Sequence, residues 1–186
     1  MVQLSQARQT ARLTLRRFTL DDLDSLALIL ANEDVNRYLY SAPRDRATTL
    51  AVLKGFLAKP EEPSDDNLLR VAVELRDARR VIGEFILRWT VNEHCQGEIG
   101  GSLHPHFHRQ GFASEVYEEL LVLAFTQYGL RRVVGRCDAR NVPSVRSLEK
   151  VGLHQEAHFV ENEFVKGEWT DEIVMAIRKD EWERRR

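Results

Sequence analysis

The segment Gly97–Val116, with the sequence GEIGGSLHPHFHRQGFASEV, constrains the fold of this chain more than any other part. Glu98–Leu103 has the pattern of a short strand, and its two adjacent glycines favour a bulge or a close approach of another backbone. His104–Gln110 has the composition of a loop, and the apolar stripe of a long helix starts near Gly111. The segment therefore predicts a strand, a loop and a helix in direct succession.

Composition limits the classes of protein to which the chain can belong. The 186 residues contain 27 Lys and Arg against 29 Asp and Glu, a formal charge of −2, and 43% of them are hydrophobic. This balance predicts a single domain over residues 1–186 and gives no electrostatic reason to expect nucleic acid as a partner. Apolar runs such as Leu26–Ala31 are far shorter than a membrane span. Two cysteines, Cys95 and Cys137, are too few for a disulfide scaffold, so we expect a reduced, cytoplasmic protein.

Hydrophobic periodicity predicts the other elements. Strands are predicted over Arg12–Phe18, Leu68–Leu75, Val81–Thr90, Glu98–Leu103, Arg132–Asp138, His154–Val160 and Trp169–Ile177, the last two joined by a turn at Val165–Glu168. Helices are predicted after the capping box Thr19-x-x-Asp22, over Arg46–Ala58 with Leu50, Leu53 and Leu57 facing inward, from Gly111 to Tyr128, and over Asn141–Val151. Lys59–Asn67 has the composition of a surface loop. The order β-α-α-β-β-β-α-β-α-β-β indicates an α/β (α+β) fold class, a mixed sheet with helices on its faces.

The start of the long helix has the features of a phosphate site. The first N–H groups of a helix lack intrahelical partners, and the helix dipole adds positive charge there. Gly111 has no side chain to block an approaching ligand, Ala113 is small, Ser114 offers a hydroxyl and Arg109 adds a cation. An equally weighted alternative is that Gly111 only turns the chain and Arg109 is solvated. Taken alone, the residues leave both interpretations open.

The alternating histidines of the loop suggest a second kind of site. His104, His106 and His108 would point the same way in a strand and could then bind zinc. Pro105 and the following Arg-Gln-Gly favour a loop instead, and no nearby cysteine or acid completes a ligand set. We therefore predict no metal site.

Motifs in a fixed order along the chain resemble the GNAT acyltransferase superfamily. These are the sequence LHP at the end of a strand, RQGFASE at a helix start, and NVPSVRSLEKVG after the next strand. The resemblance extends from RLTLRRFTLDDLDSL to DEIVMAIRKDEW, and it is most similar to the branch related to acetyltransferases of ribosomal-protein N-termini. It implies a mixed, mostly antiparallel central sheet with helices on both faces. It also implies that the strands on either side of the long helix splay apart to admit acetyl-CoA as co-substrate.

The resemblance carries a set of cofactor-binding residues. The family pattern Gln/Arg-x-x-Gly-x-Gly/Ala is matched at Gly111 and Ala113, whereas His108 departs from it at the leading position. Gly101–Leu103 would pair with the pantetheine arm as an added strand. Asn141 would face that arm, or would only cap its own helix. The implied cofactor-binding residues are Leu103, His108, Arg109, Gln110, Gly111, Phe112, Ala113, Ser114, Asn141 and Ser144.

The chemistry of acetyl transfer to an amine requires a base, because a protonated amine has no lone pair. Glu98 is the first candidate, acting through water, and Glu84 is its competitor. By analogy with the family, the amide of Leu103 would stabilise the oxyanion. Relatives place a tyrosine acid seven residues beyond the asparagine, where this chain has Leu148. The alternatives are Ser147, Ser144 or Tyr128 as the acid, or unassisted departure of the thiolate.

The sequence thus predicts an acetyl-CoA-dependent N-acetyltransferase that acts on a primary amine in a ternary complex. The acceptor is either a protein N-terminus or a small amine, and the family is compatible with a homodimer. The alternative is a CoA-binding sensor or interaction module without activity, because both His108 and Leu148 depart from the family pattern. Acceptor choice is expected to lie in Val35–Arg46, Glu61–Asp66 and Phe159–Trp169.

Overall fold

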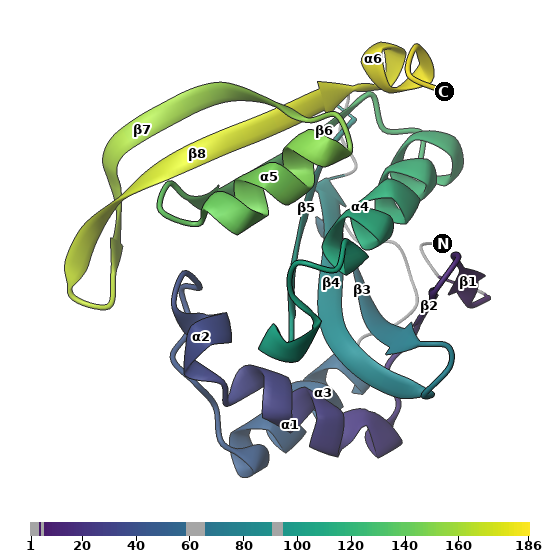
Figure 1. Cartoon of the computed structure of the whole chain (residues 1–186), viewed down its shortest axis with the longest axis vertical. Helices are drawn as coiled ribbons and strands as arrows, with labels where there is room; N and C mark the ends of the chain where they lie inside the picture. The colour runs from purple at the N-terminus through teal and green to yellow at the C-terminus, as the bar shows by residue number, and fades with distance from the viewer. Residues whose placement is uncertain (1–3, 5, 59–65, 91–94) are drawn as a thin grey trace.

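The computed structural model describes residue 4 and residues 6–58, 66–90 and 95–186. Within these ranges, eight strands form one sheet in the spatial order β1-β2-β3-β4-β5-β6-β8-β7 (Figure 1). The strands are β1 (Arg8–Gln9), β2 (Leu13–Arg16), β3 (Asp66–Leu75), β4 (Arg80–Thr90), β5 (Gln96–Leu103), β6 (Arg132–Asp138), β7 (His154–Val165) and β8 (Glu168–Arg178). The neighbouring pairs are antiparallel, except that β5 and β6 are parallel. The mixed, mostly antiparallel sheet expected from the sequence is confirmed.

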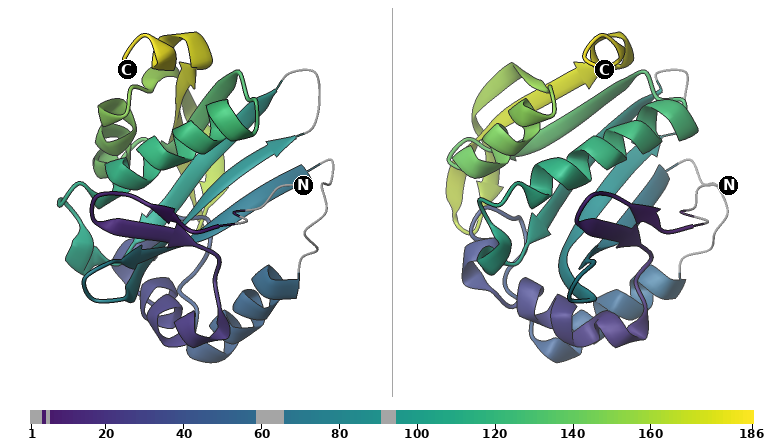
Figure 2. Two further views of the ribbon diagram at one scale, coloured as in Figure 1. Left: turned by 90° about the vertical axis from the view of Figure 1, so that its right-hand side faces the viewer. Right: turned by 45° about the vertical axis from the view of Figure 1, so that its right-hand side comes forward.

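Helices cover both faces of this sheet (Figure 2). The helices are α1 (Leu23–Leu30), α2 (Glu33–Asn36), α3 (Arg46–Ala58), α4 (Phe112–Val122), α5 (Val142–Lys150) and the short α6 (Lys179–Glu183). On one face, the apolar stripe of α4 packs against Phe85 and Ile99 of the sheet. On the other face, α1 and α3 pack against Ala72 and Val81. Since successive side chains of a strand point to opposite faces, β3 serves both cores, with Val71 in the first and Ala72 in the second.

One predicted helix face is rotated relative to the expectation. Leu53 is fully buried, but Leu57 is 38% exposed, so the prediction that Leu57 faces inward is wrong. The buried stripe of α3 follows Thr49, Leu53 and the partly buried Phe56 instead. These positions are four and three residues apart, and Leu57 falls at the edge of that stripe. The predicted loop over Lys59–Asn67 falls mostly on residues outside the described ranges, and its last residues belong to β3.

The long helix is not α-helical over the whole predicted span. After Val122 it widens into a π-turn over Leu123–Gln127, in which the Tyr128 N–H donates to the Leu123 carbonyl (3.0 Å). Three successive residues of this turn, Leu123, Ala124 and Phe125, are buried. The turn begins beyond the first turn of α4, so it leaves the start of the helix regular.

The β7–β8 hairpin is longer than predicted and extends away from the rest of the sheet (Figure 1). Its turn lies at Val165–Glu168 as expected. Lys166 and Gly167 have φ angles of 52° and 89°, which are those of a type I′ turn, whose twist matches that of the strands. The Lys166 ammonium contacts the Asn36 carbonyl at the end of α2, so the hairpin tip is attached to the segment that follows α1.

A buried ion pair joins β2 to the start of α1. Asp22 is 6% exposed and accepts two hydrogen bonds from the Arg16 guanidinium (2.7 and 2.8 Å). It also accepts one from the Thr19 N–H (2.8 Å), which is the contact that the capping-box pattern predicts. Arg16 Nε donates in addition to Glu74 of β3 (2.8 Å). The cluster therefore ties the first helix to the edge of the sheet.

We expect Asp22→Asn to lower the free energy of unfolding by about 3 kcal/mol, because it leaves the partly buried Arg16 charge poorly compensated. Burial acts to raise the pKa of Asp22, but hydrogen bonds from Arg16 and from the Thr19 N–H outweigh it, and the pKa lies below its ordinary value. The carboxylate thus stabilises the fold above the unfolded pKa of about 3.9, and this contribution disappears as the pH falls through the lower folded pKa.

Urea titrations at pH 7 and pH 2 test this expectation, and the difference between wild type and variant should shrink at the lower pH. The control is Asp24→Asn, because Asp24 forms an exposed pair with Arg46 (2.9 Å) and its loss should cost less than about 0.5 kcal/mol. Equal effects of the two substitutions at pH 7 would contradict a stabilising role for the buried pair.

Candidate active site

The strands β5 and β6 are paired over only part of their length. Gln96–Glu98 pairs in parallel with Arg132–Val134, and beyond this point β5 pairs with β4 while β6 pairs with β8. The remaining residues of β5, Ile99–Leu103, therefore have no strand partner on the β6 side within the described part of the chain. The splayed strand pair that the family resemblance implies is present.

Backbone hydrogen bonds on either side of β5 show which of its groups face this gap. The Cys95 carbonyl accepts from Arg131 N–H on the β6 side (2.8 Å), and the His104 N–H donates to Ile82 O on the β4 side (2.9 Å). The backbone groups of successive residues in a strand point to opposite neighbours, so the N–H and C=O groups of the odd-numbered residues of β5 point toward β6. The N–H and C=O groups of Gly101 and Leu103 are thus directed into the gap.

The side chain of His108 is hydrogen-bonded to one of these backbone groups. Its Nε2 atom lies 2.9 Å from the Leu103 carbonyl oxygen. A carbonyl can only accept, so Nε2 carries the hydrogen and only Nδ1 is left to meet a ligand. His108, a predicted cofactor-binding residue, is therefore directed at the end of β5, while the Leu103 N–H and both backbone groups of Gly101 face the gap.

The start of α4 presents the bare amides predicted from the sequence. Gly111 is the residue before the first helical turn and has a φ angle of 81°, a conformation that glycine adopts without strain. The first intrahelical bond runs from the Glu115 N–H to the Gly111 carbonyl (3.1 Å). The N–H groups of Phe112, Ala113 and Ser114 precede it and have no intrahelical acceptor. This geometry is suited to a bound phosphate.

Two cations lie beside Gly111 that sequence analysis missed. A Cβ atom at Gly111 would lie 3.6 Å from Arg12 Nη2 and 3.7 Å from Lys150 Nζ. Arg12 is fixed by Glu115 (2.7 Å), by the Gln110 carbonyl (2.9 Å) and by stacking on the Phe112 ring. Residues about 100 and 40 positions from Gly111 give no local sequence signal, because only the fold brings them together.

The other predicted residues of the loop have less defined roles. Arg109 is exposed, has a φ angle of 59°, and forms no hydrogen bond or ion pair with another described residue. Gln110 donates from its side chain to the His106 carbonyl (2.8 Å), which holds the loop together. Ser114 is buried, and its hydroxyl donates to the Ser147 carbonyl (3.4 Å), so this hydroxyl joins α4 to α5.

The wall opposite β5 is formed by β6 and the start of α5. Asn141 caps α5, since its side-chain oxygen accepts from the Ser144 N–H (3.3 Å). The Ser144 hydroxyl acts to lower the pKa of both the Tyr117 hydroxyl and the Cys137 thiol, although burial outweighs it. Burial raises the pKa of Cys137 to about 11 and also raises that of Tyr117. A thiol with such a pKa is protonated near pH 7 and is a poor nucleophile.

The position at which the family usually has its acid is occupied here by a buried leucine. Leu148 is 2% exposed and packs against Gly135 of β6, where an added Cβ atom would lie 2.8 Å from it. The Ser147 hydroxyl donates to the Pro143 carbonyl of its own helix (2.8 Å). The Ser147 proton is therefore engaged within the helix, whereas the Ser144 hydroxyl lies among other polar groups.

The two candidate bases lie on the same face of the sheet, the one that α1 covers. Across the β4–β5 pair, Glu84 lies opposite Ser102 and Glu98 lies opposite Arg88. Side chains alternate along each strand, so these even-numbered residues all point to the same face. Glu84 is 15% exposed and forms an ion pair with Arg70 (2.7 Å). Glu98 is 39% exposed, and Arg136 Nε lies 4.0 Å from its carboxylate. Glu98 is therefore the less committed of the two carboxylates.

A second carboxylate, Glu172, shares the Arg136 guanidinium with Glu98, and sequence analysis missed it. Glu172 of β8 is 4% exposed and accepts hydrogen bonds from Arg136 and Asn162 (both 3.1 Å). Burial of the Tyr40 hydroxyl and then the charges of Glu163, Glu172 and Glu98 raise the pKa of Tyr40, against the effect of Arg136. Tyr40 thus reports an acidic environment at this end of the gap, formed by three strands and the loop after α2.

Two of the predicted catalytic groups, the Glu98 carboxylate and the Leu103 amide, belong to residues that lie far apart along β5. Glu98 and Leu103 are five residues apart, which corresponds to about 16 Å of extended strand. A carboxylate and an oxyanion donor that serve one carbonyl carbon must lie within reach of one bound amine. The Gly101 N–H, which faces the same gap, is three residues or about 10 Å from Glu98 along the strand. Gly101 therefore fits a reaction centre with Glu98 better than Leu103 does.

The three alternating histidines belong to a short 3-10 helix, Pro105–Phe107, and its ends. His104 Nδ1 accepts from the His106 N–H (3.3 Å), while His108 contacts the Leu103 carbonyl on the other side of the loop. In the described part of the chain, no group of three or more His, Cys, Asp or Glu side chains is arranged to hold a metal ion. None of the helices in those ranges has the length and apolar character needed to cross a membrane.

Comparison with known proteins identifies the class to which this fold and site belong. Residues 12–154 match the family model of the acetyltransferase (GNAT) domain. The chain is 30% identical over 173 residues to a Bacillus subtilis (strain 168) protein described as uncharacterized N-acetyltransferase YnaD, covering 93% of this chain and 97% of the relative. The chain belongs to the GNAT acetyltransferase family, and it is an acetyltransferase.

Solved structures agree with this assignment. The acetyltransferase (GNAT family) from Bacillus anthracis has a TM-score of 0.83 and 25% identity, covering 95% of this chain and 100% of that one. The spermidine N-acetyltransferase from Vibrio cholerae, solved in complex with CoA and spermine, has a TM-score of 0.76 and 22% identity. That comparison covers 93% of this chain and 99% of the Vibrio protein, and at this identity it supports the fold alone.

Proposed function

We propose that this acetyltransferase transfers the acetyl group of acetyl-CoA to a primary amine, by direct attack within a ternary complex. The observation that carries the proposal is the gap between β5 and β6, which has outward-facing amides on one side and the bare start of α4 at its end. A single extended ligand with amide groups and a diphosphate matches both features.

Acetyl-CoA fits the residues present. The amides of Phe112, Ala113 and Ser114 would hold its diphosphate, with Arg12 and Lys150 as the nearby cations. The edge of β5 at Gly101–Leu103 and the cap residue Asn141 would line its pantetheine arm. When bound, acetyl-CoA supplies a thioester whose carbonyl carbon accepts an amine. His108 would hold the end of β5 in place rather than contact phosphate through Nε2.

The side chains around the gap would then prepare the amine. Glu98 would remove the amine proton through a water molecule, because an ammonium group cannot attack. The neighbouring carboxylates would attract the cationic amine before it loses that proton. The Gly101 N–H would donate to the carbonyl oxygen as charge develops on it. These roles use groups of β5, β7 and β8.

The Ser144 hydroxyl, rather than that of Ser147, would donate a hydrogen bond to the departing thiolate, which then takes its proton from solvent. We expect Ser144→Ala to lower kcat about tenfold and to leave the affinity for acetyl-CoA within about twofold, since a positioned donor gives only modest help to a thiolate. Ser147→Ala should leave kcat within about twofold, because its hydroxyl donates to Pro143. Steady-state kinetics of the two variants compares them directly. A larger effect of Ser147→Ala on kcat would reverse the assignment.

The test of the proposed function is acetyl-CoA turnover with a mixed panel of primary amines. We expect release of free CoA thiol that depends on the added amine, with an acetylated amine detected by mass spectrometry. Tight acetyl-CoA binding without turnover by any amine would instead favour the sensor function. That alternative has some support in the departures at His108 and Leu148.

A further inference from the structure

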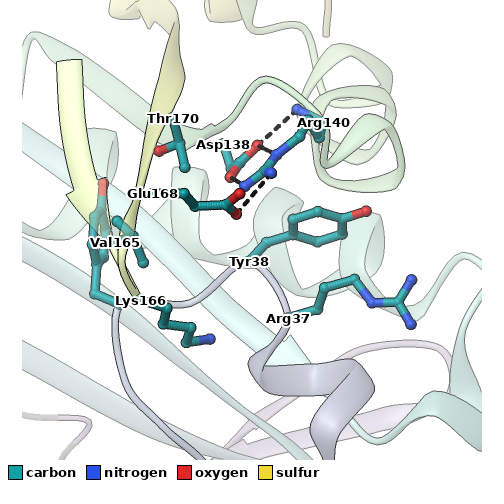
Figure 3. Close-up of a pocket in the computed structure, with 9 residues that line it drawn as sticks. Arg37, Tyr38, Asp138, Arg140, Val165, Lys166, Glu168 and Thr170 are labelled. Atoms are coloured by element: carbon teal, nitrogen blue, oxygen red, sulfur yellow. Dashed lines mark hydrogen bonds and ion pairs between the residues drawn. The ribbon is translucent and has the colours of Figure 1, made fainter. Parts of the chain in front are cut away.

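A small open pocket lies next to the carboxylates of the candidate amine site. Its volume is about 320 Å³, part of which is open to solvent. The loop after α2, the end of β6 and the β7–β8 turn line it (Figure 3). Two of these segments, the loop and the turn, belong to the regions in which sequence analysis expects acceptor choice to lie.

Strand register fixes the position of this pocket relative to the carboxylates. Asp138, in its wall, lies two residues beyond Arg136 on β6, and Thr170 lies two residues before Glu172 on β8. Side chains two residues apart on a strand point to the same face and are separated by about 7 Å. Tyr40 lines the pocket and also has the acidic neighbours described above. The pocket therefore adjoins the acidic cluster, and Asp138 of its wall is paired across the strands with Glu172 itself.

Tyr40 has acidic neighbours that include Glu98, whereas the pocket that it lines also contains three cations. Arg140 is engaged by Asp138 (2.7 and 2.9 Å) and by Glu168 (2.9 Å), as the dashed lines in Figure 3 show. Arg37 is paired with Asp34 (2.6 Å). Among the described residues that line the pocket, Lys166 is the cation whose partner is neutral, the Asn36 carbonyl. An ammonium group has three donors, so two remain for a ligand.

The backbone of Lys166 is also unusual for its residue type. It occupies the first central position of the type I′ turn with a φ angle of 52°. That position favours asparagine, aspartate or glycine, and another residue type there carries a conformational cost. The sequence thus places a cation at a position where turn stability alone selects a different residue.

We propose that the acceptor is a small amine that also carries a carboxylate, which Lys166 binds while the amine lies among the carboxylates near Glu98. This inference rests on the proposed function and narrows its acceptor. The opposed charges at the two ends of the site match a molecule with one cationic and one anionic end. A polyamine would place a second ammonium group against Lys166, which is unfavourable.

The experiment compares three acceptors of one chain length with the intact protein and acetyl-CoA. These are 5-aminopentanoate, its carboxamide 5-aminopentanamide, and 1,5-diaminopentane, which differ only in the charge of the end opposite the reacting amine. We expect kcat/KM for the carboxylate to exceed that for the amide and the diamine by at least about tenfold, as a charge-assisted hydrogen bond predicts.

Variants of Lys166 test the residue itself. Lys166→Asn removes the charge and introduces the residue type that the turn favours, so the hairpin should be retained. We expect it to bring the carboxylate-to-amide ratio of kcat/KM to within about twofold of one. Lys166→Glu should shift the preference to the diamine. Lys54→Gln, a change of an exposed lysine on α3, is the matched control and should leave the ratio unchanged.

The outcomes separate this inference from the proposed function. If all three amines are acetylated without a preference for the carboxylate, or if Lys166→Asn leaves that preference intact, the inference is wrong and the acetyltransferase function stands. If no primary amine is acetylated, the proposed function fails and the inference fails with it. A carboxylate preference that is lost in Lys166→Asn and kept in Lys54→Gln supports the inference.

Discussion

Gly111→Asp should weaken acetyl-CoA binding by at least about 100-fold. A carboxylate at this position would meet Arg12 and Lys150, whose charged atoms lie 3.6 and 3.7 Å from the added Cβ atom, and would occupy the space in front of the helix start. It would repel the diphosphate and compete for the same cations. The φ angle of 81° adds a conformational cost of about 1 kcal/mol for a residue with a side chain. Titration calorimetry with acetyl-CoA measures the effect.

The charge of this substitution can be separated from its size. Gly111→Asn adds a side chain of nearly the same shape, tolerates a positive φ angle and carries no charge. We expect it to weaken binding by about tenfold, so that the remaining loss in Gly111→Asp reflects repulsion. Thermal unfolding of both variants shows whether the fold is retained. Wild-type affinity in Gly111→Asp would contradict the phosphate cradle.

Glu98→Gln should lower kcat by about 100-fold and leave the affinity for acetyl-CoA within about twofold. The amide cannot accept a proton from the amine, and general bases contribute about 100- to 10,000-fold to rate. Glu98 lies outside the predicted cofactor cradle, so acetyl-CoA binding should not depend on it. Stopped-flow or steady-state thiol release gives kcat, and titration calorimetry gives the affinity.

The control for Glu98 is the competing carboxylate. Glu84→Gln removes the partner of Arg70, which lies 2.7 Å away, so it should lower the melting temperature while kcat changes by less than about threefold. A loss of kcat in Glu84→Gln together with normal turnover in Glu98→Gln would exchange the two roles. A normal kcat in both variants would make Glu163 the next candidate for the base.

Local sequence signals predicted the part of the site that depends on short stretches of chain. Gly111 marks the start of α4 because glycine adopts a positive φ angle without strain, and Asn141 caps α5 with a proline in its first turn. The type I′ turn at Lys166 and Gly167 was located from the glycine. The order of strands and helices followed from hydrophobic periods, which depend on neighbouring residues.

Contacts between distant segments were beyond the reach of those signals. Nothing in the pattern around Gly111 indicates that Arg12 and Lys150 lie beside it. The direction of the Gly101 and Leu103 amides depends on the register of β5 against two other strands. The prediction that Leu57 faces inward was wrong because the spacing of the apolar residues in α3 fits two helix faces that differ by one residue. Packing against the sheet selects between these two faces.

The roles of single polar residues were the least predictable. His108 occupies the place of a family cofactor contact, but its ring is turned to the Leu103 carbonyl. A histidine in a loop can donate in several directions, and only the loop geometry fixes which one. The acidic surroundings of Tyr40 arise from β5, β7 and β8, strands that are far apart in the sequence.

A crystal structure of the protein with CoA bound tests the central claim most directly. We predict that the diphosphate accepts hydrogen bonds from the amides of Phe112–Ser114 and that the pantetheine arm lies along Gly101 and Leu103 in place of a missing strand. A ligand bound elsewhere, with the gap between the two diverging strands closed by the protein's own side chains, would contradict the account.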